Sequence, residues 1–236
     1  MIVIPMVGNS SRFFDAGYPL PKYQLMLDEH TVFYHAVNSF RQYFSTDLFV
    51  FMVRTDHDAV NFVKKQLVEL GVENYQLVTF NETTRGQADT VYLGLQGLTS
   101  DNGVYIFNID TFRPDFVKPE FAEECDGYLE VFKGEGDHWS FVEPAPDFRV
   151  TKTTEKQRIS DLCSDGLYYF KHVETFNQLF LDAVEKNDTV KGEYYIAPLY
   201  NGLIEKGADV RYDLVELSQI QFCGTPAEYE ALVKQA

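Results

Sequence analysis

Three residue types that bind phosphate stand close together near the start of the chain. Gly8 follows an apolar run at residues 1–6, and a glycine at a strand end lets the backbone approach a ligand closely. Successive N–H groups in such a loop can form an anion-binding nest. Arg12 adds a forked, permanently charged donor set, and Lys22 follows two prolines that limit where its ammonium can point. The spacing therefore favours a loop that binds phosphate groups.

Two common phosphate-binding motifs are absent from this stretch. The chain has neither the Walker pattern G-x-x-x-x-G-K-[ST] nor the dinucleotide pattern G-x-G-x-x-G. A strand followed by an ordinary polar turn remains the simpler interpretation of Gly8 taken alone, because a glycine after a strand is common.

The whole string carries more information than its glycine. It reads G-x-S-x-R over residues 8–12 and A-G-Y-x-x-P-K over residues 16–22. This pattern resembles the signature of the sugar-phosphate nucleotidylyltransferases (nucleoside-diphosphate-sugar pyrophosphorylases), especially the short bacterial members of capsule and surface-polysaccharide pathways. The resemblance runs over residues 1–229 and is most specific in the N-terminal motif. It implies an α/β fold with a Rossmann-like, three-layer arrangement and a mixed, mostly parallel sheet.

The resemblance also implies roles for the residues of the motif. In the family the loop holds a nucleoside triphosphate, the arginine neutralises the departing pyrophosphate, and the lysine contacts phosphate at the reacting centre. The loop residues that would bind nucleotide here are Gly8, Asn9, Ser10 and Ser11. The catalytic roles fall on Arg12 and Lys22.

A carboxylate follows an expected strand further along the chain. Residues 103–110 read GVYIFNID, and α/β sheets bind ligands at the carboxyl ends of their strands. Mg2+ prefers one or two carboxylates completed by phosphate oxygens and water. The family has its metal-binding aspartate at this point, so the resemblance makes Asp110 the expected Mg2+ ligand. A turn or helix-cap role is the alternative.

A polar loop at residues 81–87 precedes an expected helix that starts at Ala88. The family has a comparable G-x-A segment after a strand, and that loop reads the nucleobase. By this resemblance Gly86 and Gln87 lie against the base, with Arg85 close by. A glutamine amide offers both a donor and an acceptor. An ordinary loop at a helix start is the alternative.

The acceptor residues are implied by weaker matches in the second half. The family carries a V…E-K segment followed by G-[ILV]-Y-x-F, which corresponds to Glu155, Lys156 and a strand that starts at Gly166. Its glutamate binds polar groups of the acceptor, and its lysine binds the acceptor phosphate. An E-Y-Y…N segment adds Glu193 and Asn201. An exposed charged turn is an equal alternative for Glu155.

The sequence departs from the family pattern at two positions. The second glycine of the family loop is Ser10 here, whose side chain can crowd or hydrogen-bond the phosphates. The family's other metal-binding aspartate lies two residues before the glycine of a closing D-x-G-T-P, and this chain has Phe222 there. Weaker metal binding, a substitute ligand such as Asn108, or a slowed enzyme would follow.

Apolar periodicity predicts the elements that position these residues. The expected strands are residues 1–6, 48–53, 75–80, 103–110, 127–132, 140–142, 148–150, 166–170 and 210–215. The expected helices are residues 30–44, 59–70, a segment from 88, 173–184 and 194–204. Strands that alternate with helices in the first half favour a mostly parallel sheet with right-handed crossovers.

Composition sets further bounds. The 236 residues are 45% apolar, which fits one large α/β domain spanning residues 1–236, with a nucleotide-binding half (1–115) and an acceptor-binding half (116–236). A net charge of −16 argues against nucleic acid or an anionic membrane as a partner. No apolar run reaches the ~18 residues of a membrane span. Three cysteines without C-x-x-C spacing suggest a cytoplasmic protein without a zinc site.

The expected activity is nucleotidyl transfer from a nucleoside triphosphate to a small phosphorylated acceptor, with Mg2+ as cofactor. Two alternatives stay open. A glycosyltransferase is favoured only by Asn108-x-Asp110, which loosely matches a D-x-D metal motif. A non-catalytic nucleotide-binding homologue is favoured by Ser10 and Phe222. The likeness to short relatives favours a pyrimidine base, with CTP as the first candidate triphosphate. The sequence does not determine the acceptor or the oligomeric state.

Overall fold

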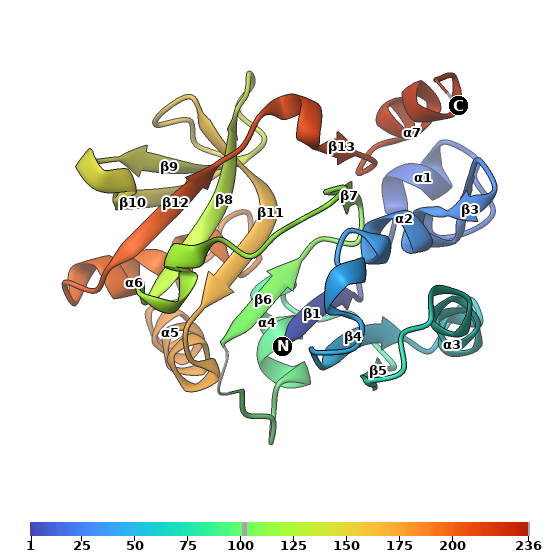
Figure 1. The fold of residues 1–236 in the computed structure, drawn as a ribbon, viewed down its shortest axis with the longest axis horizontal. Helices are drawn as coiled ribbons and strands as arrows, with labels where there is room; N and C mark the ends of the chain where they lie inside the picture. Colours follow the sequence, from blue (N-terminus) through green and yellow to red (C-terminus); the bar gives the residue numbers. More distant parts are fainter. Residues whose placement is uncertain (101–102, 236) are drawn as a thin grey trace. The chain divides into compact units, whose positions relative to one another are not determined.

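The structure, a computed structural model, describes residues 1–100 and 103–235. The chain packs into two compact units (Figure 1). The N-terminal unit contains residues 2–83, 108–117 and 218–235, and the central unit contains residue 1, residues 84–107 and residues 118–217. The chain thus passes between the two units several times. The division into a nucleotide-binding half (1–115) and an acceptor-binding half (116–236) stays a prediction.

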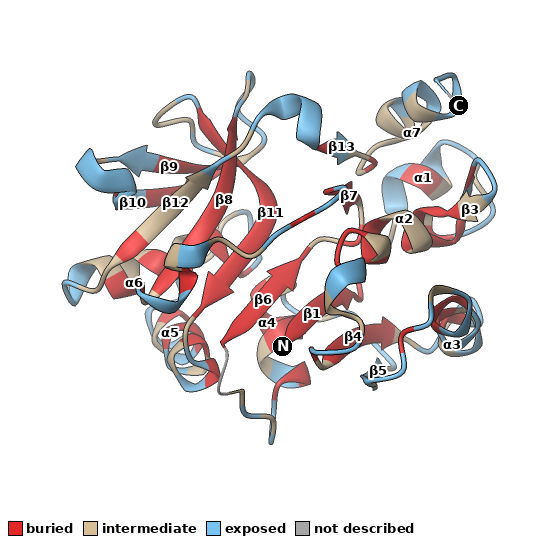
Figure 2. Ribbon diagram, in the orientation of Figure 1, coloured by how far each residue is buried: buried red, intermediate tan, exposed pale blue. Residues whose placement is uncertain are grey.

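Three parallel strands run through the N-terminal unit. They are β1 (Ile2–Met6), β4 (Phe49–Arg54) and β5 (Tyr75–Phe80), in the order β1-β4-β5. All of β1 and most of β4 are buried (Figure 2), as the continuous apolar runs of strands covered on both faces require. The carboxyl end of β1 leads into the loop that carries the candidate phosphate-binding residues at positions 8–12.

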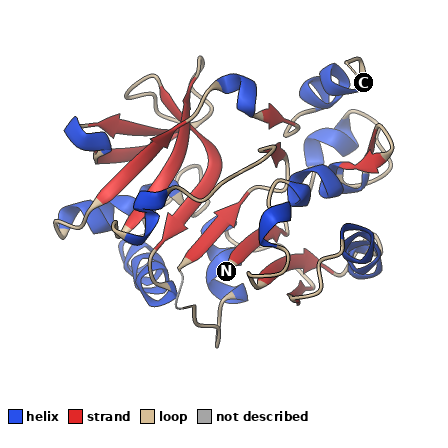
Figure 3. Cartoon of the chain, in the orientation of Figure 1, coloured by secondary structure: helices blue, strands red, loops and turns tan. Residues whose placement is uncertain are grey.

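Helices and short strands complete the N-terminal unit (Figure 3). Helix α3 (Ala59–Leu70) connects β4 to β5 and ends at Gly71, whose left-handed φ of 77° confirms the expected stop. The other helices are α1 (Ser11–Asp15), α2 (Val32–Asn38), α7 (Pro226–Val233) and the 3-10 turns η1 (Lys22–Gln24) and η2 (Arg41–Tyr43). The short strands pair as β2 (Met26–Leu27) with β3 (His30–Thr31), and β7 (Thr111–Phe112) with β13 (Gln221–Phe222).

The central unit is built around β11 (Leu162–Phe170), all nine residues of which are buried. Strand β11 pairs antiparallel with β6 (Val104–Phe107), β8 (Gly127–Lys133) and β9 (Ser140–Pro144). Strand β10 (Val150–Glu155) pairs antiparallel with β9, and β12 (Val210–Leu214) pairs parallel with β8. This mixed sheet carries the segments that the sequence assigns to the acceptor.

Tyr200 anchors the helical layer of the central unit to its sheet. The residue begins α6 (Tyr200–Glu205) and is fully buried. Its hydroxyl donates to the carbonyls of Tyr128 and Tyr169 at 2.9 and 2.8 Å, which ties α6 to β8 and β11. The other helical segments are α4 (Gln87–Gly94), α5 (Val173–Lys186), η3 (Glu120–Glu123), η4 (Pro146–Phe148), η5 (Ala197–Leu199) and, at the boundary, η6 (Leu217–Gln219).

Several expected elements differ from the structure. The helix expected over residues 30–44 is interrupted, because residues 30–31 form β3, α2 ends at Asn38 and the separate turn η2 covers Arg41–Tyr43. The strand expected over residues 103–110 is shorter, because β6 covers only Val104–Phe107. The strand expected at 148–150 is wrong, because residues 146–148 form η4 and β10 begins only at Val150. Asp147 and Phe148 take left-handed φ angles of 61° and 59° there, which a strand does not allow. The helix expected over residues 194–204 starts only at Ala197, as η5 followed by α6. Within the described residues, no helix is long and apolar enough to cross a membrane.

Helix α3 offers a matched test of its packing. Val63 is fully buried and Val68 is 80% exposed on the same helix. We expect Val63→Ala to lower the free energy of unfolding by about 2 kcal/mol, because it removes buried methyl groups and leaves a cavity. Val68→Ala should change it by less than about 0.5 kcal/mol. Urea denaturation of both variants measures the difference, and equal losses would contradict this placement of α3.

Candidate active site

The Gly8 loop, residues 7–12, leaves the carboxyl end of β1 and enters α1. A Cβ placed on Gly8 would have no heavy atom within 4 Å, so the backbone there borders open space. A ligand can therefore approach this backbone closely. Nothing in the local packing requires glycine at this position, which separates Gly8 from the glycines that only relieve strain.

Ser10 shows what the first departure from the family pattern does. Its φ of 50° is left-handed, a conformation that glycine adopts more easily than serine. Its hydroxyl oxygen accepts a hydrogen bond from the backbone N–H of Lys22 at 3.3 Å. The serine side chain thus links the Gly8 loop to the segment that carries the lysine.

Lys22 and Asp110 are 88 positions apart in sequence and form an ion pair in the N-terminal unit. The Lys22 ammonium donates to Asp110 Oδ2, and the two side chains are 22% and 20% exposed. Lys22 begins η1 directly after Pro21. The Asp110 carbonyl accepts a hydrogen bond from the Cys223 N–H at 2.8 Å, which links the backbone at Asp110 to the segment that follows β13.

Phe222 lies beside Asp110, as the family pattern implies for its missing aspartate. Phe222 is opposite Thr111 in the β7–β13 pair. A Cβ placed on Gly224 would stand 2.9 Å from Asp110 Oδ2 and 3.6 Å from Glu228 Oε2. The glycine therefore keeps the space next to both carboxylates clear of a side chain.

These residues fit a magnesium ion that arrives with its substrate. Among the described residues, no group of three or more His, Cys, Asp and Glu side chains is placed to hold a metal by itself. Mg2+ needs only one or two protein carboxylates when phosphate oxygens and water supply its other ligands. Asp110 is one carboxylate available for this, and the nearby Glu228 Oε2 already accepts a hydrogen bond from the Thr225 N–H at 2.9 Å.

Arg12 lies on α1 and is exposed. Its side chain has no hydrogen-bond or ion-pair partner within residues 1–100 and 103–235. The Arg12 guanidinium is therefore available to an anion, in contrast to the ammonium of Lys22.

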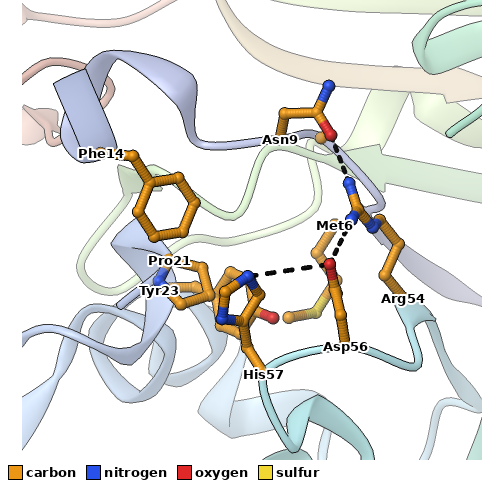
Figure 4. Close-up of a pocket in the computed structure, with 9 residues that line it drawn as sticks. Met6, Asn9, Phe14, Pro21, Tyr23, Arg54, Asp56 and His57 are labelled. Carbon is orange, nitrogen blue, oxygen red and sulfur yellow. Dashed lines mark hydrogen bonds and ion pairs between the residues drawn. The ribbon is translucent and has the colours of Figure 1, made fainter. Parts of the chain in front are cut away.

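A cavity of about 230 Å³ lies against the Gly8 loop (Figure 4). It is lined by Met6, Gly8, Asn9, Phe14, Pro21, Tyr23, Arg54, Asp56 and His57. The cavity combines an aromatic wall, where Phe14 and His57 stack with ring centroids 5.3 Å apart, with a polar wall formed by Arg54 and Asp56. Sequence reasoning missed this polar wall.

The expected base-reading residues start α4 in the central unit. Arg85 donates to the Asp89 carboxylate through Nε at 3.2 Å and Nη2 at 2.8 Å, and its guanidinium lies over the Tyr194 ring. A Cβ on Gly86 would come within 2.5 Å of the Tyr194 carbonyl oxygen, and its φ is 123°, so this position requires glycine. Gln87 is the first residue of α4.

Lys156 ends up in a cluster of acceptor candidates at the end of β10. Its ammonium donates to the Tyr195 hydroxyl, lies 4.0 Å from the centre of that ring, and is 3.4 Å from Glu155 Oε1. The Tyr195 hydroxyl in turn donates to Glu193 Oε2 at 2.6 Å. The structure thus brings together Glu155, Lys156 and Glu193, three of the five residues expected to contact the acceptor.

Glu155 is buried, which excludes the exposed turn weighed for it from the sequence. Its side chain is 6% exposed and accepts a hydrogen bond from the Ser140 hydroxyl. Burial raises the pKa of the Glu155 carboxyl above 4.5, while Ser140 and Lys156 act in the opposite direction.

Asn201 and Gly166 have local structural partners. The Asn201 amide accepts from the Thr153 N–H at 2.9 Å and donates to the Thr153 carbonyl at 3.0 Å, which fastens α6 to β10. Gly166 has a φ of 97° where the register of β11 against β8 shifts. These contacts account for both residues locally, and their roles towards an acceptor stay predictions.

Comparison with solved structures identifies the family. The chain matches a nucleoside-diphosphate-sugar pyrophosphorylase from Vibrio cholerae RC9 with a TM-score of 0.96 and 46% sequence identity, over 100% of both chains. The chain belongs to the nucleoside-diphosphate-sugar pyrophosphorylase family. The resemblance that the N-terminal motif carries is therefore confirmed. No protein-family model and no curated protein matches the chain.

More distant structures share the fold of this pyrophosphorylase relative. A putative glucose-1-phosphate thymidylyltransferase from Bacillus anthracis matches with a TM-score of 0.78 and 19% identity, over 100% of this chain and 94% of that one. The inositol-1-phosphate CTP transferase from T. maritima matches with a TM-score of 0.75 and 16% identity, over 99% and 94%. They confirm the α/β nucleotidyltransferase fold with its mixed, mostly parallel sheet.

Sequence reasoning missed three polar residues of this family member. Arg54 contacts Asn9, Tyr195 contacts Lys156, and Ser140 contacts Glu155. Arg54 is the polar end of an apolar strand, a position that can indicate a site in an α/β sheet. Tyr195 and Ser140 give no comparable indication, because their contacts span 39 and 15 positions.

The raised pKa of Glu155 predicts a pH-dependent stability effect. Because the unfolded chain ionises this carboxyl more readily than the folded protein, Glu155 costs stability as pH rises above about 4.5. Glu155→Gln does not ionise and escapes this cost. We expect the melting temperature of the variant minus that of the wild type to increase from about pH 4.5 to neutral pH. Thermal melts across this range test it, and a difference that shrinks with rising pH contradicts it.

Proposed function

We propose that this protein transfers a nucleoside monophosphate from a nucleoside triphosphate to a small phosphorylated acceptor, a sugar phosphate in the first instance, and releases pyrophosphate. The observation that carries the proposal is the full-length match, at 46% identity, to a nucleoside-diphosphate-sugar pyrophosphorylase. The exposed backbone at Gly8 and the nearby cations Arg12 and Lys22 supply what a triphosphate needs.

The proposed reaction is one in-line displacement. A phosphate oxygen of the acceptor attacks the α-phosphorus, the bond from that phosphorus to the bridging oxygen of the β-phosphate breaks, and pyrophosphate leaves. No covalent enzyme intermediate forms, so the protein contributes position and charge. Lys22 holds the α-phosphate and Arg12 the departing pyrophosphate. Asp110 would hold Mg2+, which would supply positive charge to the phosphates.

The central unit supplies the specificity in this proposal. Lys156 binds the phosphate of the acceptor. Glu155 and Glu193 accept hydrogen bonds from the polar groups of the acceptor. Asn201 and Gly166 shape the same region. Arg85, Gly86 and Gln87 contact the base. The thymidylyltransferase and the CTP transferase that share the fold are named for pyrimidine nucleotides, which supports a pyrimidine triphosphate here, with CTP tested first.

The wider role is part of the same proposal. A soluble cytoplasmic enzyme of nucleotide-sugar biosynthesis, which supplies a capsule polysaccharide, fits the family and the motif. A glycosyltransferase is disfavoured, because the matching relative is a pyrophosphorylase. A non-catalytic homologue is the remaining alternative, and Phe222 is the residue that favours it.

Binding of a triphosphate is the first experiment. A ligand that binds only the folded state raises the melting temperature, so the four common triphosphates are screened with and without Mg2+. We expect one to give a Mg2+-dependent shift that Asp110→Ala abolishes. Gly8→Ala should keep the melting temperature of the free protein, because its Cβ meets open space, and should reduce the shift. An unchanged shift in Gly8→Ala would contradict phosphate binding at this loop.

Pyrophosphate release tests the chemistry. The acceptor screen covers sugar 1-phosphates and other small phosphorylated compounds, with the triphosphate that gave the shift. Arg12→Ala and Lys22→Ala should each lower kcat about 100-fold or more, because each removes a preorganised charge from the transition state. The KM for the acceptor should change little. Lys64→Ala, an exposed lysine of α3, is the matched control. Normal turnover in Arg12→Ala would overturn its role.

A further inference from the structure

Arg54 joins two loops at the carboxyl edge of the parallel sheet. It is the last residue of β4, and its two terminal nitrogens have different partners. One donates to Asn9 Oδ1 in the Gly8 loop, and the other donates to Asp56 Oδ2 in the turn at residues 55–58 (Figure 4). The guanidinium therefore connects the Gly8 loop to that turn.

Arg54, Asn9 and Asp56 all line the cavity of about 230 Å³ that lies against the loop. On the cavity side the Gly8 loop lacks the close packing that fixes most backbone in a protein interior. In this loop the backbone of Ser10 also has a left-handed conformation, which a serine does not favour. A loop with these two properties depends on specific polar contacts to keep one conformation.

The turn at residues 55–58 is itself well fixed. The His57 ring stacks on Phe14, with an angle of 24° between the ring planes. The His57 carbonyl accepts from Gln24 Nε2 at 2.9 Å. The turn therefore contacts the segments that follow the Gly8 loop, while Arg54 contacts the loop itself.

We propose that Arg54 is a positioning residue for nucleotidyl transfer, which holds the Gly8 loop in its phosphate-binding conformation through Asn9. The inference rests on the proposed function, because the loop must bind a triphosphate for its conformation to matter. A lysine cannot replace this residue, since only the forked guanidinium reaches Asn9 and Asp56 together.

A purely structural ion pair with Asp56 explains less. Within the described chain, Arg54 Nε is buried and has no hydrogen-bond partner. An unsatisfied buried donor costs stability, so a hydrophobic residue would serve a purely structural purpose better. The hydrogen bond to Asn9 accounts for an arginine at this position, because it contacts the Gly8 loop.

The experiment compares Arg54→Met, Asn9→Ala and the double variant. Arg211→Met is the matched control, because Arg211 is 24% exposed against 23% for Arg54 and also pairs with an aspartate, Asp209. Hydrogen exchange of residues 7–12 is measured in the protein without nucleotide. The Kd for CTP, with the other three triphosphates in parallel, and the KM for the acceptor are measured with Mg2+.

Supportive results have a defined pattern. Exchange at residues 7–12 should be several-fold faster in Arg54→Met and Asn9→Ala but not in Arg211→Met. The triphosphate Kd should rise about tenfold in each of the two variants, with the acceptor KM nearly unchanged. The triphosphate Kd of the double variant should be close to that of the single variant with the higher Kd, because both substitutions remove the same contact.

Two results would overturn the inference. One is unchanged exchange at residues 7–12 in Arg54→Met, even if its melting temperature falls. The other is a double variant in which the two losses of affinity multiply. If no triphosphate binds the wild type, the proposed function fails, and the exchange measurement still decides whether Arg54 holds the loop.

Discussion

The ion pair between Lys22 and Asp110 is the contact on which the N-terminal site depends. A separate hydrogen bond holds the backbone of each partner. The Ser10 hydroxyl oxygen accepts from the Lys22 N–H, and the Cys223 N–H donates to the Asp110 carbonyl. Both side chains are mostly buried, so each charge would be costly without the other. In the protein without substrate, each of these two charges is therefore neutralised by the other. In the proposed function, a phosphate would take over the role of partner for Lys22 and a metal ion that for Asp110.

The same arrangement recurs in the central unit. The Lys156 ammonium has Glu155 on one side and the Tyr195–Glu193 contact on the other. In this chain, which has a net charge of −16, carboxylates pair with both lysines that the proposed function assigns to phosphate groups. Arg12 is the exception, because its side chain has no partner in the described part of the chain. An exposed arginine can reach an anion that must later leave.

The departures from the family pattern have different structural consequences. Ser10 takes the strained backbone conformation that glycine would take easily, and its hydroxyl gains a contact with Lys22. Phe222 pairs its backbone with Thr111 as part of a two-stranded ladder and brings no carboxylate. The first departure adds a link within the site. The second leaves Asp110 and the nearby Glu228 as the carboxylates around Gly224.

The sequence by itself determined the family and the elements with strong local patterns. The N-terminal motif, the strand at residues 75–80 and the helix at residues 59–70 follow from local composition and periodicity. Only the tertiary structure decided which side chains meet. Arg54 reaches Asn9 across 45 positions, and the β7–β13 pair brings Phe222 beside Asp110. Such contacts depend on how strands pair at a distance, and strands of two residues carry no periodicity that could reveal them.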